Sequence, residues 1–251
     1  MDLIPIRNPF PGASCYLVAV TDSTMDEARR LAASGLPAGT VVAADRQTAG
    51  RGRLRGRSWH SEPGRDLTFT VILPACASRA AGLPLRAGLA LYRAVSDYAA
   101  VLGAPEPLPL SIKWPNDLLY GGRKVAGMLC ESSAGLCLLG AGVNCGKPGV
   151  PGLRTEATGL VEELGAPVDR FHILELFLAR LVEALAERDW AEETTRRLWL
   201  LGSRARFRTG TAEPGGRVLE GFVRSVNSDG LLVLETENGL EALASGELSA
   251  L

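Results

Sequence analysis

The spacing of apolar residues along the chain predicts both helices and strands. Apolar positions three and four residues apart predict helices over residues 24–34, 85–102 and 173–185. The first of these helices also carries a start signal. Ser23 and Thr24 each stand three residues before an acidic residue, which is the capping-box pattern, and Gly35 fits the position just after the helix.

Shorter apolar runs predict strands. In the longest of these runs, apolar residues either alternate with polar ones or follow one another without a break. In the first two hundred residues these strands are residues 40–44, 67–73, 110–114, 123–131 and 136–143. Gly121 and Gly122 indicate a two-residue hairpin turn before the fourth of these strands, and residues 132–135 indicate a second hairpin turn after it.

The pattern changes after about Ser203, where short alternating runs are separated by turn residues such as Asn227 and Gly230. The predicted strands there are residues 205–211, 217–226, 231–236 and 240–244. About fifty residues of this kind make a small barrel with a thin core. We therefore expect this module to depend on the larger domain for its stability.

Composition limits the classes of protein that fit. A chain of 251 residues suggests one large domain, or one and a half, and the 46% of hydrophobic and 22% of charged residues are typical of a soluble globular protein. We find no apolar stretch long enough to span a bilayer and no secretory signal, so we expect no membrane partner and a cytoplasmic location. The five cysteines form no C-x-x-C pair and there are two histidines, which argues against a disulfide framework, a zinc site or a Ser-His-Asp triad.

Four arginines stand at every second position of one glycine-rich loop, residues 50–57. An extended backbone would point Arg51, Arg53, Arg55 and Arg57 to one side, where they would attract an anion. Such a loop can be a solvated basic segment or a nucleic-acid contact. A phosphorylated small molecule fits better, because the net charge is −1 and Trp59 is the single nearby aromatic on which a base could stack.

Two further segments carry candidate chemistry. If Gly121 and Gly122 form the turn, Asp117 pairs with residue 126, which makes Asp117 and Lys124 diagonal neighbours on one face of the sheet. The alternative is an ordinary surface ion pair. Residues 140–144 form a strand with two glycines that ends in Asn144, and such glycines mark either the close approach of a ligand or packing against a helix.

Together these residues resemble the biotin protein ligases in order and spacing over nearly the whole chain. The matching motifs are Asp22-Ser23-Thr24, Gln47-x-x-Gly50-Arg51-Gly52-Arg53, Trp59-x-Ser61, Lys113-Trp114-Pro115-Asn116-Asp117, Lys124-x-x-Gly127 and Gly140-x-Gly142-x-Asn144. The arginine motif alone is weak, but its distance from the lysine-tryptophan motif and from Lys124 makes the set specific. The departures from the common family pattern are Met25, Leu54, Glu62 and Gly146.

The resemblance implies an α+β fold with a mixed, largely antiparallel sheet flanked by helices over residues 1–203, and a small SH3-like β-barrel over residues 204–251. It implies an enzyme that joins biotin to ATP as biotinyl-5′-AMP, releases pyrophosphate, and then transfers the biotinyl group to one lysine of a biotin carboxyl carrier protein. Mg²⁺ would accompany ATP, with Asp117 as a candidate neighbour. A homodimer is compatible with the resemblance.

The resemblance also assigns roles to individual residues. The catalytic candidates are Lys124, Arg51 and Asp117. The candidates for binding biotin are Ser23, Thr24, Gln47, Gly50, Arg51, Lys124, Gly127 and Gly140. The candidates for binding ATP or the adenylate are Arg53, Arg57, Trp59, Lys113, Asn116, Asp117 and Asn144.

Two rival functions follow from the same features. A lipoate or octanoate ligase or transferase shares the general architecture, although Ser23, Gln47 and the lysine-tryptophan motif favour biotin. A nucleic-acid-binding module would use the arginine loop instead. About twenty residues precede Ser23, too few for the helix-turn-helix module of bifunctional relatives, so we expect a ligase that is not a repressor and has no nucleic-acid partner.

Overall fold

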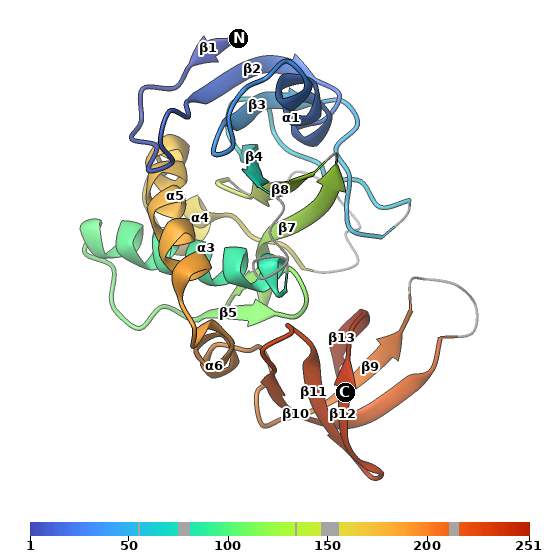
Figure 1. Ribbon diagram of the computed structural model, residues 1–251. Helices are drawn as coiled ribbons and strands as arrows, with labels where there is room; N and C mark the ends of the chain where they lie inside the picture. Colours follow the sequence, from blue (N-terminus) through green and yellow to red (C-terminus); the bar gives the residue numbers. More distant parts are fainter. Residues whose placement is uncertain (55, 75–80, 134, 147–155, 211–215) are drawn as a thin grey trace.

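The computed structural model describes residues 1–54, 56–74, 81–133, 135–146, 156–210 and 216–251. Three positions that belong to the loops and strands predicted above therefore lie outside the described residues, namely Arg55, Ala134 of the second hairpin turn, and Thr211. The described chain folds into an eight-stranded mixed sheet with helices on both faces, and a separate five-stranded sheet follows it (Figure 1). The α+β fold class is confirmed.

The eight-stranded sheet has the order β1-β2-β3-β4-β8-β7-β6-β5 and is antiparallel except between β2 and β3. Its strands are β1 (Asp2–Leu3), β2 (Cys15–Thr21), β3 (Val41–Gln47), β4 (Leu67–Pro74), β5 (Leu110–Lys113), β6 (Asp117–Tyr120), β7 (Arg123–Ser133) and β8 (Leu136–Val143). A parallel pair needs a crossover connection, and the helix α1 (Thr24–Ala33) supplies it between β2 and β3.

Helices cover both faces of this sheet. On one face α1 packs over Val42, Ile72 and Leu138, and on the other face α3 (Leu83–Val101) and α5 (Arg170–Ala186) cover a larger core (Figure 1). Successive side chains of a strand point to opposite faces, so Val41 belongs to the larger core and Val42 to the smaller one. The central strand β4 is buried over seven of its eight residues for this reason. The short helices are α4 (Leu160–Leu164) and α6 (Trp190–Arg196).

The three predicted helices are confirmed, with small differences at their ends. Ser23 caps α1 by accepting a hydrogen bond from the amide of Met25, and Gly35 after the helix has a positive φ of 87°. The pattern did not predict β2, whose inner residues are half-buried or exposed and therefore lack a clear alternation. It also missed the short strands β1 and β13 and the short helices α4 and α6.

The hairpin between β6 and β7 departs from its predicted register. Asp117 pairs with Gly127, not with Ala126, because a β-bulge adds one residue to β7. The cause lies outside the hairpin. The amide and carbonyl of Lys124 form hydrogen bonds with the segment 156–158, which draws this part of β7 away from regular pairing with β6.

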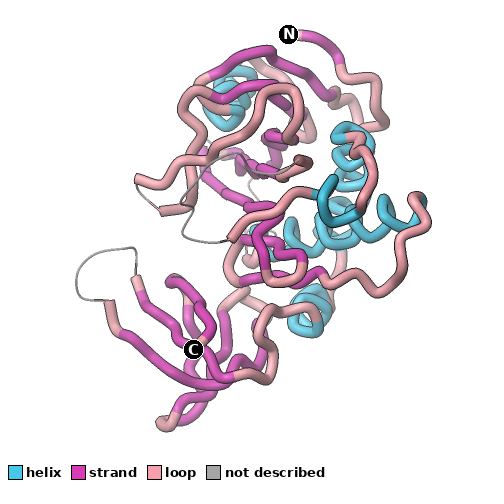
Figure 2. Tube along the Cα trace, turned by 180° about the vertical axis from the view of Figure 1, so that it is seen from behind, coloured by secondary structure: helices cyan, strands magenta, loops and turns pink. Residues whose placement is uncertain are grey.

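The five-stranded sheet has the order β12-β11-β10-β9-β13, all antiparallel, and Figure 2 shows it from behind, below the larger sheet. Its strands are β9 (Arg204–Thr209), β10 (Val218–Val226), β11 (Leu232–Thr236), β12 (Gly239–Leu243) and β13 (Gly246–Ala250). These strands are consistent with the SH3-like module expected from the sequence. No described helix is long and apolar enough to cross a membrane.

Trp114 joins the two sheets. This side chain is 2% exposed, its ring centroid lies 5.6 Å from that of Phe207 on β9, and its Nε1 donates a hydrogen bond of 3.0 Å to the carbonyl of Gly230. Trp114 directly follows β5, so the same short segment ends the larger sheet and packs on the smaller one. The smaller sheet therefore packs on the larger domain through Trp114.

The variant Trp114→Ala should lower the free energy of unfolding by about 3–5 kcal/mol, because it leaves a cavity between the sheets and an unpaired carbonyl. Urea denaturation followed by circular dichroism measures this loss. Trp199→Phe, a milder change at a half-buried position, serves as the control. A loss below about 1 kcal/mol for W114A would mean that the two sheets do not stabilise one another through this ring.

Candidate functional site

A pocket opens between the N-terminus of α1, the arginine loop and the middle of β7 and β8. The neutral polar side chains that line it are Ser23, Thr24, Gln47 and Asn116, and the cationic ones are Arg51, Arg53 and Lys124. The sequence analysis predicted that residues from four distant segments form one site. The fold brings these residues together at the pocket.

The hydroxyls and the amide at α1 are ordered by hydrogen bonds. The backbone amide and the hydroxyl of Thr24 donate to Oε1 of Gln47 over 2.8 and 3.2 Å, and the hydroxyl of Thr70 donates to that of Thr24 over 2.9 Å. Because Oε1 of Gln47 accepts both hydrogen bonds from Thr24, Nε2 of the same side chain remains as a donor for another group. These groups can read a neutral polar ligand by both donors and acceptors.

Glycines make room for other side chains on the sheet. A Cβ atom on Gly142 would lie 2.2 Å from Cε2 of Trp59, and one on Gly140 would lie 3.1 Å from Sδ of Met25. The close approach that the sequence indicated is therefore made by side chains of the protein itself. Trp59 lines the pocket, and its Nε1 is buried with no hydrogen-bond acceptor among the described residues, which leaves a donor for a ligand.

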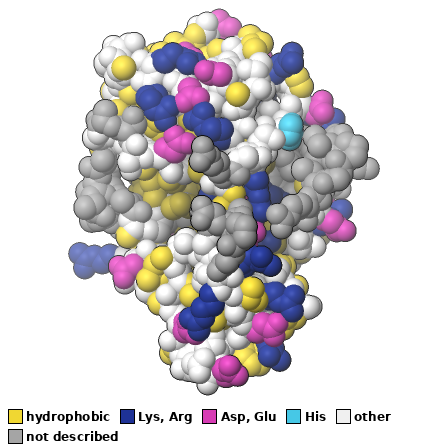
Figure 3. Space-filling view, turned by 90° about the vertical axis from the view of Figure 1, so that its right-hand side faces the viewer, with side chains coloured by type: hydrophobic (Ala, Val, Ile, Leu, Met, Phe, Trp, Pro, Cys, Tyr) yellow, Lys and Arg dark blue, Asp and Glu magenta, His cyan; other side chains and the backbone are white. Residues whose placement is uncertain are grey.

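The arginines of the loop are held by different parts of the chain. Arg51 forms an ion pair with Asp26 of α1, whereas Arg53 donates to the carbonyl of Gly246 over 2.8 Å and Arg57 pairs with Glu247 over 2.5 Å. On the face drawn in Figure 3, basic and acidic side chains lie next to one another. This interleaving does not resemble the one-signed surface of a nucleic-acid binder.

Lys124 and Asp117 meet as the sequence predicted, although the register differs. Their Nζ and Oδ1 atoms are 2.7 Å apart, and the side chains are 25% and 18% exposed. The Lys124 ammonium also lies 5.7 Å from the centroid of the Trp59 ring. Burial lowers the pKa of nearby Lys113, which stands over the ring of Trp199 at 4.8 Å.

Five of the candidate residues do not line the pocket. These are Gly50, Arg57, Lys113, Asp117 and Asn144. Asp117 contacts Lys124, which does line the pocket. Asn144 is buried and donates a hydrogen bond of 3.1 Å to the carbonyl of Thr158, so the Asn144 amide holds the 156–158 segment against β7. Sequence reasoning did not place Met128 and Leu129 in the pocket, because their apolar side chains carry no signal that separates a pocket wall from the core.

No group of three histidine, cysteine, aspartate or glutamate side chains that could hold a metal ion occurs among the described residues. The carboxylates bonded to the pocket cations are already paired, Asp117 with Lys124 and Asp26 with Arg51. A divalent cation that accompanies ATP would therefore take most of its ligands from phosphate oxygens and water.

Comparisons with known proteins agree on one family. The model of the biotin/lipoate A/B protein ligase family matches residues 17–147. The biotin--[acetyl-CoA-carboxylase] ligase of Paracoccus denitrificans is 36% identical over 92% of this chain and 98% of its own length. The bifunctional ligase/repressor BirA of Bacillus subtilis is 30% identical over 91% of this chain and 71% of its own.

Solved structures give the same result. The biotin protein ligase from Aquifex aeolicus in complex with biotin and ATP superposes with a TM-score of 0.77 and 30% identity, over 94% of this chain and 97% of that one. The biotin protein ligase from Leishmania major in complex with biotinyl-5-AMP has a TM-score of 0.67 and 28% identity, over 94% of this chain and 100% of that one.

We expect Gly142→Ala to lower the free energy of unfolding by about 1–3 kcal/mol, because the added methyl group would overlap the Trp59 indole. The same substitution in a Trp59→Ala background should cost much less, since the overlap is gone. Chemical denaturation of the two single variants and the double variant measures the difference. An equal loss of unfolding free energy from G142A in both backgrounds would contradict the contact between residue 142 and Trp59.

Proposed function

The chain belongs to the biotin/lipoate A/B protein ligase family, and from this premise we propose that it is an ATP-dependent biotin protein ligase. It forms biotinyl-5′-AMP from biotin and ATP and then transfers the biotinyl group to a lysine of a biotin carboxyl carrier protein. The observation that carries this proposal is that one pocket combines neutral hydrogen-bonding groups with three cations, Arg51, Arg53 and Lys124. Biotin has a neutral ureido ring and an anionic carboxylate, and this combination of groups suits both.

The neutral groups suit the ureido ring. Ser23 and Thr24 at the start of α1 supply hydroxyls, and Gln47 supplies an amide that Thr24 already orients. Gly127 and Gly140 line the same pocket, and they leave room there for the side chains of Lys124 and Met25. Gly50 cannot carry a side chain, because a Cβ atom there would lie 2.6 Å from the carbonyl oxygen of Trp59.

In the first step an oxygen of the biotin carboxylate attacks the α-phosphorus of ATP, the bond from that phosphorus to the bridging oxygen breaks, and pyrophosphate leaves. Two anions repel one another, so cations must hold both in line. Lys124 suits the point where they meet, because a compact ammonium can follow charge as it moves between carboxylate and phosphate. Arg51 binds the carboxylate, and Arg53 binds the phosphates.

In the second step the lysine amine of the carrier attacks the acyl carbon, and AMP leaves. A lysine is protonated at neutral pH and is then not a nucleophile, so a carboxylate on its path must accept a proton. Asp117 would take this role, and its contact of 2.7 Å with the Lys124 ammonium supports the assignment.

The remaining candidates lie on the nucleotide side in this proposal. Trp59 offers a ring for stacking and a buried Nε1 donor, and Asn116 lines the same pocket. For Arg57, Lys113 and Asn144, which do not line it, a place near the nucleotide rests on the resemblance alone. Mg²⁺, bound mainly to the phosphates and close to Asp117, would offset negative charge on the leaving pyrophosphate.

The proposal extends to the organisation of the protein. Residues 1–203 would form the catalytic domain and residues 204–251 the barrel, with the boundary just before β9. The acceptor would be the carrier domain of a biotin-dependent carboxylase, the reaction would take place in the cytoplasm, and neither a nucleic acid nor a membrane would take part.

We expect Lys124→Ala and Arg51→Ala each to lower the rate of pyrophosphate release with biotin and ATP by about 10²–10³-fold, because each removes a cation aimed at charge that develops during the reaction. Arg123→Ala is the matched control. Arg123 is the neighbour of Lys124 in sequence but pairs with Glu163 at the protein surface. A coupled pyrophosphate assay measures the rates, and unchanged turnover of both site variants would refute the assignment.

Biotin should raise the melting temperature of the protein, and lipoate at the same concentration should not, because a ligand stabilises the native state in proportion to its binding. A thermal shift measurement distinguishes the two vitamins. A larger shift with lipoate would favour the rival ligase within the family. Steeply salt-dependent binding of DNA or RNA, with indifference to biotin, would favour a nucleic-acid-binding module instead.

A further inference from the structure

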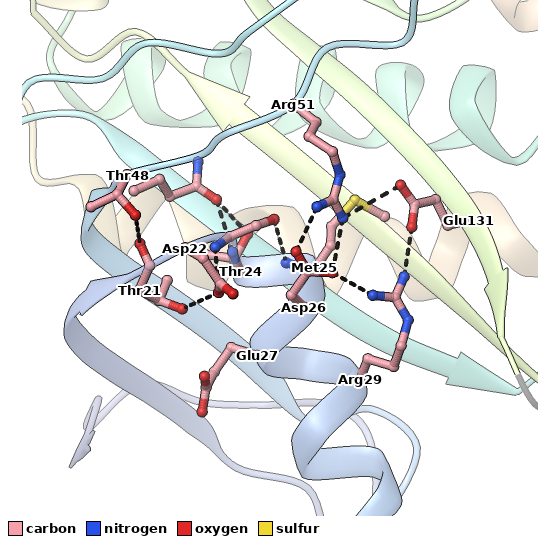
Figure 4. A network of polar contacts seen from close by, with 12 residues as sticks. Thr21, Asp22, Thr24, Met25, Asp26, Glu27, Arg29, Thr48, Arg51 and Glu131 are labelled. Carbon is pink, nitrogen blue, oxygen red and sulfur yellow. Dashed lines mark hydrogen bonds and ion pairs between the residues drawn. The ribbon is translucent and has the colours of Figure 1, made fainter. Parts of the chain in front are cut away.

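Four charged side chains form a closed ring beside the pocket (Figure 4). Asp26 pairs with Arg51 through two contacts, NH1 to Oδ2 over 2.5 Å and NH2 to Oδ1 over 3.0 Å, and it also pairs with Arg29. Glu131 of β7 closes the ring, 2.7 Å from Arg29 and 3.7 Å from Arg51. The ring therefore links the arginine loop, α1 and β7.

Arg51 is the member of this ring that faces the pocket. Arg51 is among the described residues that line the pocket, whereas Asp26, Arg29 and Glu131 are not. The acids therefore lie behind the guanidinium and do not occupy the space in front of it. The hydrogen bond to Asp26 raises the pKa of Arg51, and the same bond lowers the pKa of Asp26, so both stay charged at neutral pH.

A guanidinium has five N–H donors, and Asp26 takes one from each of the two terminal nitrogens. Three donors remain for a ligand. The ring as a whole has two cations and two anions and is neutral, so an incoming anion does not meet a net repulsion from the two acids.

We propose that Asp26, supported by Glu131 and Arg29, is a positioning residue that fixes the guanidinium of Arg51 for the carboxylate of biotin. This inference rests on the proposed function. Asp26 is suited to the task because it lies in the first turn of the helix whose start, Ser23 and Thr24, lines the same pocket. One helix therefore carries both the neutral groups and the anchor for the cation.

Two ligands distinguish this role from a general structural one. Biotin has the carboxylate that Arg51 would bind, and biotinol has a neutral hydroxymethyl group in its place. Asp26→Asn keeps the shape of the side chain but removes its charge. We expect the Kd of D26N for biotin to rise about tenfold, and the Kd for biotinol to change less than about twofold, by isothermal titration calorimetry.

Stability should change little. Asp26 is 24% and Arg51 40% exposed, and ion pairs with this much exposure contribute little to folding, so the melting temperature of D26N should stay within about 2 °C of that of the wild type. The steady-state KM for biotin should rise with little change in kcat. Asp26→Glu retains the charge and should restore most of the affinity for biotin.

Glu27→Gln is the matched control. Glu27 is the next residue of α1 and also pairs with an arginine, Arg30, over 2.5 Å, but it takes no part in the ring. We expect E27Q to bind biotin as the wild type does. The double variant R51A/D26N should bind biotin no more weakly than R51A alone, because Asp26 acts through Arg51.

Several results would overturn the inference. They are an equal loss of affinity for biotin and biotinol in D26N, additive losses in R51A/D26N, the same loss in E27Q as in D26N, and tighter binding of biotin by D26N. The last would show that Asp26 competes with the ligand for Arg51. If the wild type binds neither biotin nor biotinol, the proposed function itself fails, and the two failures are thereby distinguished.

Discussion

Three cations around one pocket repel one another, and the structure depends on how that repulsion is offset. Each of them has an acceptor from a different part of the chain: Asp26 of α1 for Arg51, Asp117 of β6 for Lys124, and the carbonyl of Gly246 for Arg53. Because the acceptors lie on separate elements, the fold must be complete before the charges can be held together. An almost neutral chain can in this way concentrate positive charge at a single place.

The backbone provides the space for those charges. Gly142 on β8 leaves room for the Trp59 ring, and Gly140 leaves room for Met25, so small residues on a rigid sheet lie beneath large residues from a loop and a helix. The bulge at Lys124 serves the same purpose, since it aims a long side chain at Asp117 while its backbone stays bonded to residues 156–158. The arginine loop and Trp59 thus rest on α1 and on strands of the sheet.

Local signals were enough to predict the three longest described helices and most strands. They also predicted the meeting of Asp117 with Lys124, because a two-glycine turn brings its flanking residues together whatever happens elsewhere. The one-residue error in register came from a partner segment more than twenty residues away in the sequence. The contact between Arg53 and Gly246 spans 193 positions, and no pattern in either segment indicates it. The motifs predicted many of the residues that share the pocket, although five of the candidates do not line it, and they did not predict which atoms hold the side chains in place.

The burial of Trp114 has a consequence for the integrity of the enzyme. Its ring is enclosed only because Phe207 and the turn at Gly230 close over it from the smaller sheet. Proteolytic removal of that sheet would expose the indole and the neighbouring apolar surface to water, two and three residues before Asn116 and Asp117 in the chain. Molecules that have lost the smaller sheet should therefore aggregate and should not persist as a shorter active ligase. Loss of the terminal module would then lead to removal of the protein and not to altered activity.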